Sequence, residues 1–164
     1  MNENSSELKL NPESVWNYPR PPAVEHVPQR IRVVLNGQTI VDTQLAKRVL
    51  ETSHPPVYYV PPQAVRDGVL LASSRVSWCE WKGQASYYDV RVGDRTALEG
   101  AWYYPDPTPE FAAIKGYVAF YAHKMDACYV AGQRGVAQGG GFYGGWITPN
   151  ITGPFKGGPG TKGW

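Results

Sequence analysis

The stretch of this sequence richest in side chains able to do chemistry runs from residue 77 to residue 89 and reads SWCEWKGQASYYD. A lysine ammonium beside aromatic rings can hold an anionic or planar ligand by charge and stacking. Side chains alternate in facing along a strand. The two expected faces are Cys79, Trp81, Ala85, Tyr87 and Asp89 on one side and Trp78, Glu80 and Lys82 on the other. A tryptophan-rich core with Glu80 and Lys82 as a surface pair is the competing interpretation.

Nucleophilic catalysis would need a thiol or hydroxyl beside a base. Cys79 and His54 are distant in sequence, but spatial neighbours need not be sequence neighbours. Ser53 directly precedes His54, yet adjacent residues seldom face each other and no third member of a serine triad is identifiable. An enzyme that uses Cys79 as nucleophile or His54 as general base is therefore one alternative, although structural cysteines are far commoner than nucleophilic ones.

Metal and nucleotide chemistry have little support in the sequence. The two cysteines and three histidines include no Cys-x-x-Cys pair of the kind that structural zinc sites use. No two acidic residues stand two positions apart, so the paired carboxylates of two-metal phosphoryl transfer are missing. Residues 139–144 and 158–163 match the glycine fingerprint of dinucleotide-binding loops, but neither leads into a helical segment. We expect no metal and no cofactor.

Charge and hydropathy exclude further classes of protein. The 16 basic and 14 acidic residues give a net charge of +2, and the basic ones are scattered rather than gathered in the stripe typical of nucleic-acid binders. The longest mainly apolar run, residues 116–122, is far too short to span a bilayer. The N-terminus lacks the charged-then-apolar order of a signal peptide. These features predict a cytoplasmic protein that binds neither nucleic acid nor membrane.

Short strands are the elements expected to position these residues. The 18 glycines and 15 prolines interrupt nearly every stretch, which disfavours long helices, while 6 Trp, 11 Tyr and 4 Phe argue against disorder. Asn36-Gly37 between residues 31–35 and 38–41 predicts a hairpin with a type I′ turn. Further strands are expected at 57–60, on both sides of Lys82-Gly83 within 75–92, and at 96–102, 116–122 and 127–131.

One short helix is expected from Asp42 or Thr43 to about Leu50, ended by the prolines after His54. The predicted fold is thus mostly β, a small single domain of short antiparallel strands in a curled sheet or two packed sheets. We divide the chain into an extended Pro-rich segment (1–29), a β domain (30–131) and a Gly/aromatic segment (132–164). The rings among its glycines predict that this last segment wraps over the domain or a neighbouring subunit.

Four ordered motifs resemble those of the domain of unknown function 427 family: ETSHPPVYY at 51–59, CEWKGQASY at 79–87, AWYYPDP at 101–107 and VAFY at 118–121. The resemblance covers about residues 30–130, and the Gly/aromatic extension is similar to the version found in cyanobacteria. The resemblance implies a compact domain comparable to the β-tent architecture, whose relatives often hold zinc on Cys-x-x-Cys pairs that are absent here. The nucleotidyltransferase-like label sometimes given to the family conflicts with the missing carboxylate pair.

The leading hypothesis is a small-ligand-binding β domain with an aromatic pocket. The expected pocket residues are His54, Tyr58, Cys79, Trp81, Lys82, Tyr87, Trp102 and Tyr104. Lys82 would meet an anionic group of a small anionic or planar ligand, His54 would hydrogen-bond and the rings would stack. The alternatives are the enzyme described above and an assembly module, in which residues 138–164 dock between subunits of a homo-oligomer.

Overall fold

Short strands and tight turns build three main sheets in the computed structural model, which describes residues 9–161 and 163–164. The first sheet has the order β10-β9-β8-β7, with β7 Leu70–Cys79, β8 Gly83–Val92, β9 Arg95–Tyr103 and β10 Val118–Phe120. The second has the order β12-β11-β3-β4, with β3 Ile31–Leu35, β4 Gln38–Thr43, β11 Ala127–Val130 and β12 Gln133–Arg134. The third has the order β2-β5-β6, with β2 Ala23–Val27, β5 Ala46–Leu50 and β6 Val57–Tyr59. The expected mostly β fold of short antiparallel strands is confirmed.

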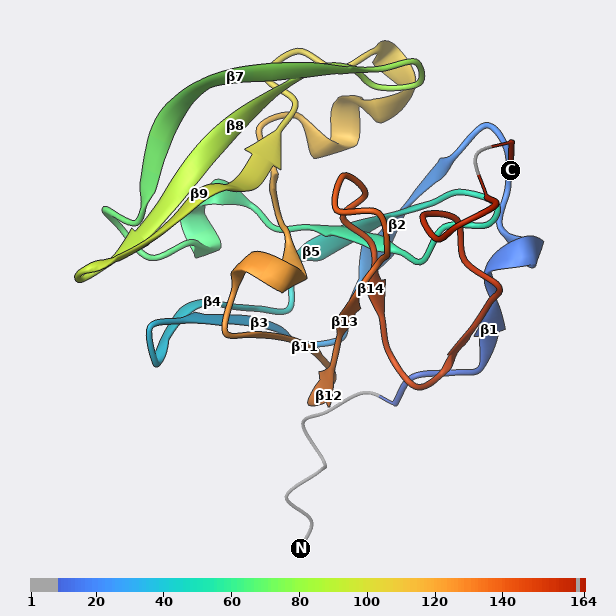
Figure 1. Cartoon of the computed structure of the whole chain (residues 1–164), viewed down its shortest axis with the longest axis horizontal. Helices are drawn as coiled ribbons and strands as arrows, with labels where there is room; N and C mark the ends of the chain where they lie inside the picture. Colours follow the sequence, from blue (N-terminus) through green and yellow to red (C-terminus); the bar gives the residue numbers. More distant parts are fainter. Residues whose placement is uncertain (1–8, 162) are drawn as a thin grey trace, which may run out of the picture.

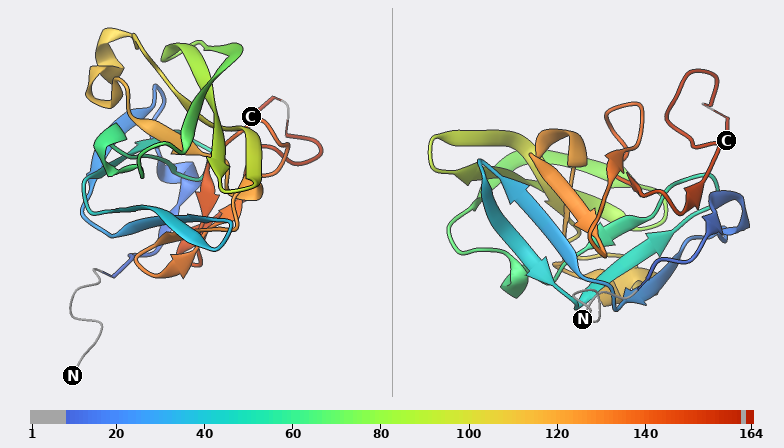
Figure 2. Two further views of the ribbon diagram at one scale, coloured as in Figure 1. Left: turned by 90° about the vertical axis from the view of Figure 1, so that its left-hand side faces the viewer. Right: turned by 90° about the horizontal axis from the view of Figure 1, so that it is seen from below.

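Two further strand pairs tie the ends of the chain to this framework. Strand β1, Glu13–Ser14, runs parallel to β15, Ile151–Thr152, and β13, Val136–Ala137, runs antiparallel to β14, Trp146–Ile147. Figure 2 shows the C-terminal segment in red beside the blue N-terminal segment at one end of the molecule. The Pro-rich N-terminal segment also supplies β2, which pairs with β5 along its whole length.

The hairpin between β3 and β4 turns at Asn36-Gly37, as the sequence predicts. Both residues have positive φ, 51° and 71°, as a type I′ turn requires. The strands predicted around Lys82-Gly83 are also confirmed, because β7 ends at Cys79 and β8 begins at Gly83.

The helix predicted from Asp42 or Thr43 to Leu50 is wrong, because this region forms the end of β4 and strand β5. A helix of so few residues is marginal by itself, whereas β5 pairs with β2 on one side and β6 on the other. Leu45, expected on the apolar side of that helix, is exposed. Helical turns of the described residues are 3₁₀ in type: η2 Val15–Asn17, η3 Pro62–Ala64, η4 Pro109–Ile114 and η5 Ala122–Lys124. Within the described ranges, none of the helical segments has the length and apolar character to cross a membrane.

The long strands of the first sheet are curled by two irregularities in their pairing. The register shifts between Ala72 and Val76 on β7, and between Tyr88 and Val90 on β8. Such bulges bend a strand and increase its twist. In Figure 1 this sheet arches over the top of the molecule, with β3, β4 and β11 at the bottom and β5 between them.

Two apolar clusters fill the space between the sheets. The first joins side chains of β3, β4 and β11 to those of β8, β9 and β10, and the second joins β5 and β6 to β8, β9 and η4. Tyr58 belongs to the first cluster and Tyr59 to the second, because neighbouring residues on a strand face opposite ways. Strand β6 therefore separates the two clusters, and a bridge between Val60 and Val118 extends this connection to β10.

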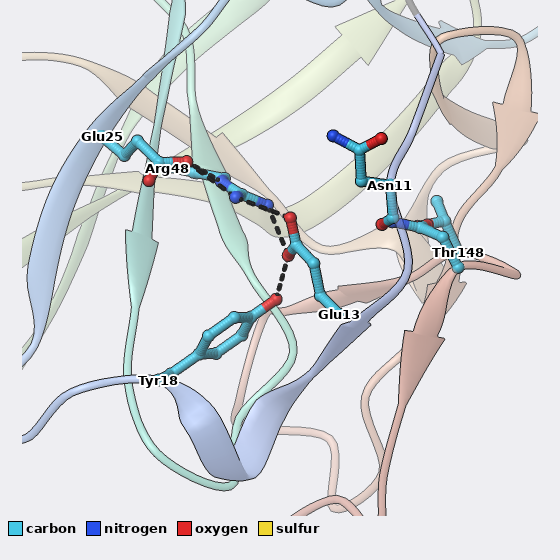
Figure 3. A network of polar contacts seen from close by, with 7 residues as sticks. Asn11, Glu13, Tyr18, Glu25, Arg48 and Thr148 are labelled. Carbon is cyan, nitrogen blue, oxygen red and sulfur yellow. Dashed lines mark hydrogen bonds and ion pairs between the residues drawn. The ribbon is translucent and has the colours of Figure 1, made fainter.

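An ion-pair network fastens β1 to the third sheet (Figure 3). The guanidinium of Arg48 donates to both carboxylate oxygens of Glu13 at 3.0 Å, and Tyr18 donates its hydroxyl hydrogen to Glu13 at 2.5 Å. Arg48 also pairs with Glu25 at 2.7 Å. Burial acts to raise the pKa of Glu13, but the hydrogen bonds from Arg48 and Tyr18 outweigh it and lower that pKa.

Replacing Glu13 with Gln tests this network through its pH dependence. Because the pKa of Glu13 is lower in the folded state, its stabilising effect is present above pH ~4.5 and is lost as the pH falls through the folded-state pKa. We expect Glu13→Gln to lower the free energy of unfolding by about 1 kcal/mol at neutral pH, a value reduced for partial exposure, and by much less in acid.

Urea unfolding at neutral pH and at about pH 3, below the usual carboxylate range, measures the difference. The matched control is Glu25→Gln, which removes the more exposed carboxylate from the same arginine and should cost less. An equal loss at both pH values would contradict the role given to the Glu13 carboxylate.

Candidate ligand-binding pocket

A pocket of about 250 Å³ lies between the third sheet and the first, with the C-terminal segment along one side. Strand β5 contributes Val49 to its wall, and β6 contributes Val57 and Tyr59. The end of β7 and the turn that follows contribute residues 77–82. The remaining wall residues are Glu51, His54, Pro55, Trp102, Tyr104, Tyr121, Gln138, Phe142, Tyr143, Gly144 and Lys156.

The structure brings most of the predicted site residues together in this pocket. Those that line it are His54, Cys79, Trp81, Lys82, Trp102 and Tyr104. Tyr58 instead faces the first apolar cluster, where its ring lies 5.1 Å from that of Trp146. Tyr87 is buried beside the pocket and shares a 2.8 Å hydrogen bond with Ser77. Tyr59, the neighbour of Tyr58 on β6, lines the pocket in its place.

Trp78 and Lys82, which are expected on one face, both line the pocket but differ in burial. The Trp78 side chain is 74% exposed, whereas Lys82 is only 8% exposed. Strand β7 ends at Cys79, so the alternation of side chains does not continue through the turn. The surface pair expected between Glu80 and Lys82 does not form, and no ion pair of Lys82 occurs within the described ranges.

The burial of Lys82 is fixed by the turn that carries it. Thr108 donates its main-chain N–H to the Lys82 oxygen at 3.1 Å and its hydroxyl to the Trp81 oxygen at 2.6 Å. The ammonium nitrogen then lies 5.7 Å from the ring centre of Tyr104 and 5.5 Å from that of Phe111. Ring faces attract a cation, and the ammonium nitrogen is not among the buried side-chain atoms that lack a hydrogen-bond partner, so it stays open to the pocket. Lys82 is thus a positive charge in the pocket that the described residues leave unmatched.

The buried side-chain amide of Gln138 contacts His54, which also lines the pocket. Gln138 lies with its amide nitrogen 3.2 Å from Nδ1 of His54, and the Glu51 carboxylate lies 3.7 Å from Nε2. Burial lowers the pKa of His54, and the nearby ammonium groups of Lys156 and Lys82 lower it further against the opposing effect of Glu51. His54 is therefore a neutral imidazole near neutral pH.

The phenols of the pocket are kept as neutral hydrogen-bond donors. Burial raises the pKa of Tyr59 and of Tyr104, and Tyr59 and Cys79 beside Tyr104 raise that of Tyr104 further. Burial likewise raises the pKa of Tyr121, which donates its hydroxyl to the main-chain oxygen of Phe142 at 2.8 Å. The rings of Trp102 and Tyr121 are 4.5 Å apart, so the pocket wall is a packed aromatic surface.

The C-terminal segment can form a pocket wall because it has glycine where it meets Trp102. A methyl group at Gly144 would overlap the Trp102 ring, and one at Gly145 would lie 2.5 Å from the main-chain oxygen of Pro55. The next residue, Trp146, is buried in the first apolar cluster and donates its indole N–H to the Phe120 oxygen at 3.0 Å.

Several pocket residues are missing from the sequence prediction: Glu51, Tyr59, Tyr121, Gln138, Tyr143, Gly144 and Lys156. Gly144 carried a signal, since a glycine among aromatic residues often marks a close approach of backbone to ring. Gln138 has no comparable sequence signal, because its contacts are with residues distant in the chain.

No group of three or more potential metal ligands gathers in the part of the chain that the structure describes. Cys79 and Cys128 are both free thiols, Cys79 partly exposed in the pocket and Cys128 buried in the first cluster. Burial raises the pKa of Cys128, which makes it unreactive at neutral pH.

Substitution of Gly144 tests the contact with Trp102. Gly144→Ala is expected to destabilise the fold by about 1–3 kcal/mol, because the ring or the segment must move to admit the methyl group. Thermal and urea unfolding measure this loss. The control is Gly158→Ala, where a methyl group meets no atom within 4 Å.

The same substitution in a Trp102→Leu background separates the ring contact from backbone effects. If the overlap with the ring causes the loss, Gly144→Ala costs less in that background. An undiminished cost would contradict the interpretation.

Comparisons with known proteins place the chain in a family but give it no function. A comparison with curated proteins finds no match. Residues 23–131 match a family described as a domain of unknown function (DUF427). This range extends from the start of β2 past the end of β11, includes Cys79, Lys82 and Trp102, and leaves out Gln138, Gly144 and Lys156. The match covers more than half of the 164 residues and confirms the resemblance carried by the four motifs. The chain therefore belongs to the DUF427 family.

Proposed function

We propose that this protein binds a small anionic ligand with a planar apolar body in the pocket between β5–β6 and β7–β9. The observation that carries the proposal is Lys82, a residue only 8% exposed whose ammonium forms no ion pair with a carboxylate among the described residues. An anion in the pocket would pair with this ammonium, and a charge-assisted hydrogen bond is stronger than one between neutral groups.

The other polar groups of the pocket support an anion rather than a cation. The hydroxyls of Tyr59 and Tyr104 stay protonated, since burial raises the pKa of each. Protonated phenols can donate hydrogen bonds to an oxyanion. Glu51 lies beside His54 at 3.7 Å, and Glu80 is exposed at the outer end of the turn. The pocket therefore presents phenol donors and the ammonium groups of Lys82 and Lys156, with the carboxylates of Glu51 and Glu80 also in its wall.

The size and walls of the pocket support a planar ligand body. A volume of about 250 Å³ is at the small end of ligand pockets and admits one ring with a short acidic group. Trp102 and Tyr104 offer ring surfaces, and Tyr59 packs edge-on against Trp102 with ring centres 6.4 Å apart. Offset and edge-on ring contacts suit an aromatic guest.

We also propose that the C-terminal segment, residues 132–164, gives this member of the family its own pocket wall. Gln138, Phe142, Tyr143, Gly144 and Lys156 all line the pocket and all follow the range that matches the family. Ligand selectivity would then depend on residues beyond the matched range.

Covalent catalysis by Cys79 is a second candidate function, favoured by the position of its partly exposed thiol in the pocket. Activation of the thiol would need a free base. Both ring nitrogens of His54 already have neighbours, Gln138 at Nδ1 and Glu51 at Nε2. The geometry therefore supports binding better than catalysis.

Replacing Lys82 with Met tests the binding proposal, with benzoate and related aromatic carboxylates as probes. We expect at least tenfold weaker binding by calorimetry, because a charge-assisted hydrogen bond contributes about 1.5–3 kcal/mol. Without ligand, Lys82→Met should melt at the same temperature as the wild type or higher, since the Lys82 ammonium has no ion pair among the described residues to lose.

The matched control is Lys47→Met. Lys47 also lies over a ring, 4.7 Å from the centre of Tyr117, but it is outside the pocket and donates to the Ala113 oxygen at 2.8 Å. Equal affinities of wild type and Lys82→Met for every probe would refute the role of Lys82.

Alkylation with iodoacetamide tests the position of Cys79. In the folded protein we expect modification of Cys79 and none of Cys128, which is fully buried and should react only after denaturation. Benzoate should slow the modification of Cys79 by occupying the same pocket. Peptide mass spectrometry distinguishes the two thiols, and modification unaffected by saturating benzoate would place the probe elsewhere.

A further inference from the structure

We infer that the loop between β13 and β14, residues 139–144, is a lid that opens to admit ligands to the pocket, and that the hydroxyl of Tyr121 holds it closed. The inference goes beyond the proposed binding function, because it concerns access to the pocket and can be tested without a ligand. It is carried by the way the loop is anchored, by its glycines, and by the few contacts between its tip and the domain.

The loop is closed at its base by two hydrogen bonds between the residues that flank it. Gln138 donates its main-chain N–H to the Gly145 oxygen at 3.1 Å, and Gly145 donates its main-chain N–H to Oε1 of Gln138 at 3.2 Å. Gln138 and Trp146, which follows Gly145, are both buried. In Figure 1 the loop extends upward from β13 and β14. Movement is therefore confined to the residues between these two anchors.

The sequence of the loop combines a free backbone with an apolar tip. Residues 139–144 read GGGFYG, so two aromatic residues lie between glycines. Gly140 and Gly141 have positive φ, 93° and 74°, a conformation that glycine adopts at little steric cost. Phe142 and Tyr143 both line the pocket. The loop thus carries two rings to the pocket on a backbone that can rotate at its glycines.

Few contacts hold the tip of this loop against the domain. Within the described ranges, a single hydrogen bond ties it to the rest of the protein, from the Tyr121 hydroxyl to the Phe142 oxygen at 2.8 Å. The Tyr143 ring packs against His54, with centres 5.2 Å apart, and the Lys156 ammonium lies 5.7 Å from the Tyr143 ring centre. A segment with so few contacts opens locally at a small free-energy cost, and loss of the Tyr121 hydrogen bond lowers that cost.

The loop covers side chains that a ligand in the pocket would contact. Trp102 and His54 both line the pocket, and both are buried. Tyr143 packs against His54, and Gly144 lies so close to Trp102 that a methyl group there would overlap the ring. Opening of the loop would therefore uncover both side chains together. Opening of such a lid often sets the rate at which a ligand leaves an enclosed site.

Tyr121→Phe tests the lid without a ligand, because it removes the hydroxyl and keeps the ring. Hydroxyl-radical oxidation, read by peptide mass spectrometry, reports the exposure of single tryptophans. Since the loss of one hydrogen bond raises the population of the open lid, we expect Trp102 to be oxidised at least about twofold faster than in the wild type. Trp146, buried in the first apolar cluster, should not change. The matched control is Tyr103→Phe, which removes a hydroxyl outside the pocket and should leave both rates unchanged.

A shortened loop tests the same point through a different change. The dipeptide Asn-Gly replaces residues 139–144, since a two-residue type I′ turn can join Gln138 to Gly145. In this variant and in Tyr121→Phe, benzoate should enter the pocket faster than in the wild type, because a larger fraction of the protein is open. Stopped-flow measurement of the association rate gives this difference, and Tyr103→Phe should match the wild type.

Equal oxidation of Trp102 in the wild type and in Tyr121→Phe would overturn the inference, whatever the binding of benzoate. A parallel rise at Trp146 would also overturn it, because the whole domain would then be loosened. Association rates that stay equal while benzoate binds would contradict entry through the loop and leave the binding function intact. Faster oxidation of Trp102, with no binding by benzoate or related aromatic carboxylates, would instead support the lid and refute the proposed function.

Discussion

The opposite facing of neighbouring side chains on strand β6 is the constraint on which the rest of this structure depends. Tyr58 enters the apolar cluster that holds Trp146, and Tyr59 enters the cluster that borders the pocket. Since β6 lies between the two clusters, a shift of one residue would exchange the two rings. Main-chain hydrogen bonds between Val60 and Val118, 2.8 and 2.9 Å long, fix this register against β10.

Local signals predicted the parts of the fold that depend on neighbours in sequence. Asn36-Gly37 predicted its hairpin because only a few residue types accept positive φ at both turn positions. The helix prediction for residues 43–50 is wrong because the apolar spacing suits a helix, whereas pairing with β2 and β6 makes residues 46–50 a strand. Pairing partners distant in the chain leave little trace in a strand's own sequence.

The same distinction between local and long-range signals applies to the pocket residues. Cys79, Trp81 and Lys82 were found because they lie together in one aromatic motif, and Trp102 because it lies in another. The sequence prediction includes Tyr58 and omits Tyr59, because the register of a three-residue strand cannot be read from alternation alone. Gln138 and Lys156 reach the pocket through a segment whose path depends on contacts with Pro55 and Trp102. Such long-range contacts have no periodic signature.

The unmatched ammonium of Lys82 makes the folded chain sensitive to its surroundings. A ligand that binds only the folded state raises the free energy of unfolding by RT ln(1 + [L]/Kd), about 2.7 kcal/mol at a concentration one hundred times Kd. A protein of modest stability gains much from such a term, because proteases act on the unfolded fraction. Under the proposed binding function, the lifetime of this protein in a cell would rise and fall with the supply of the ligand, so that its abundance would follow the ligand concentration.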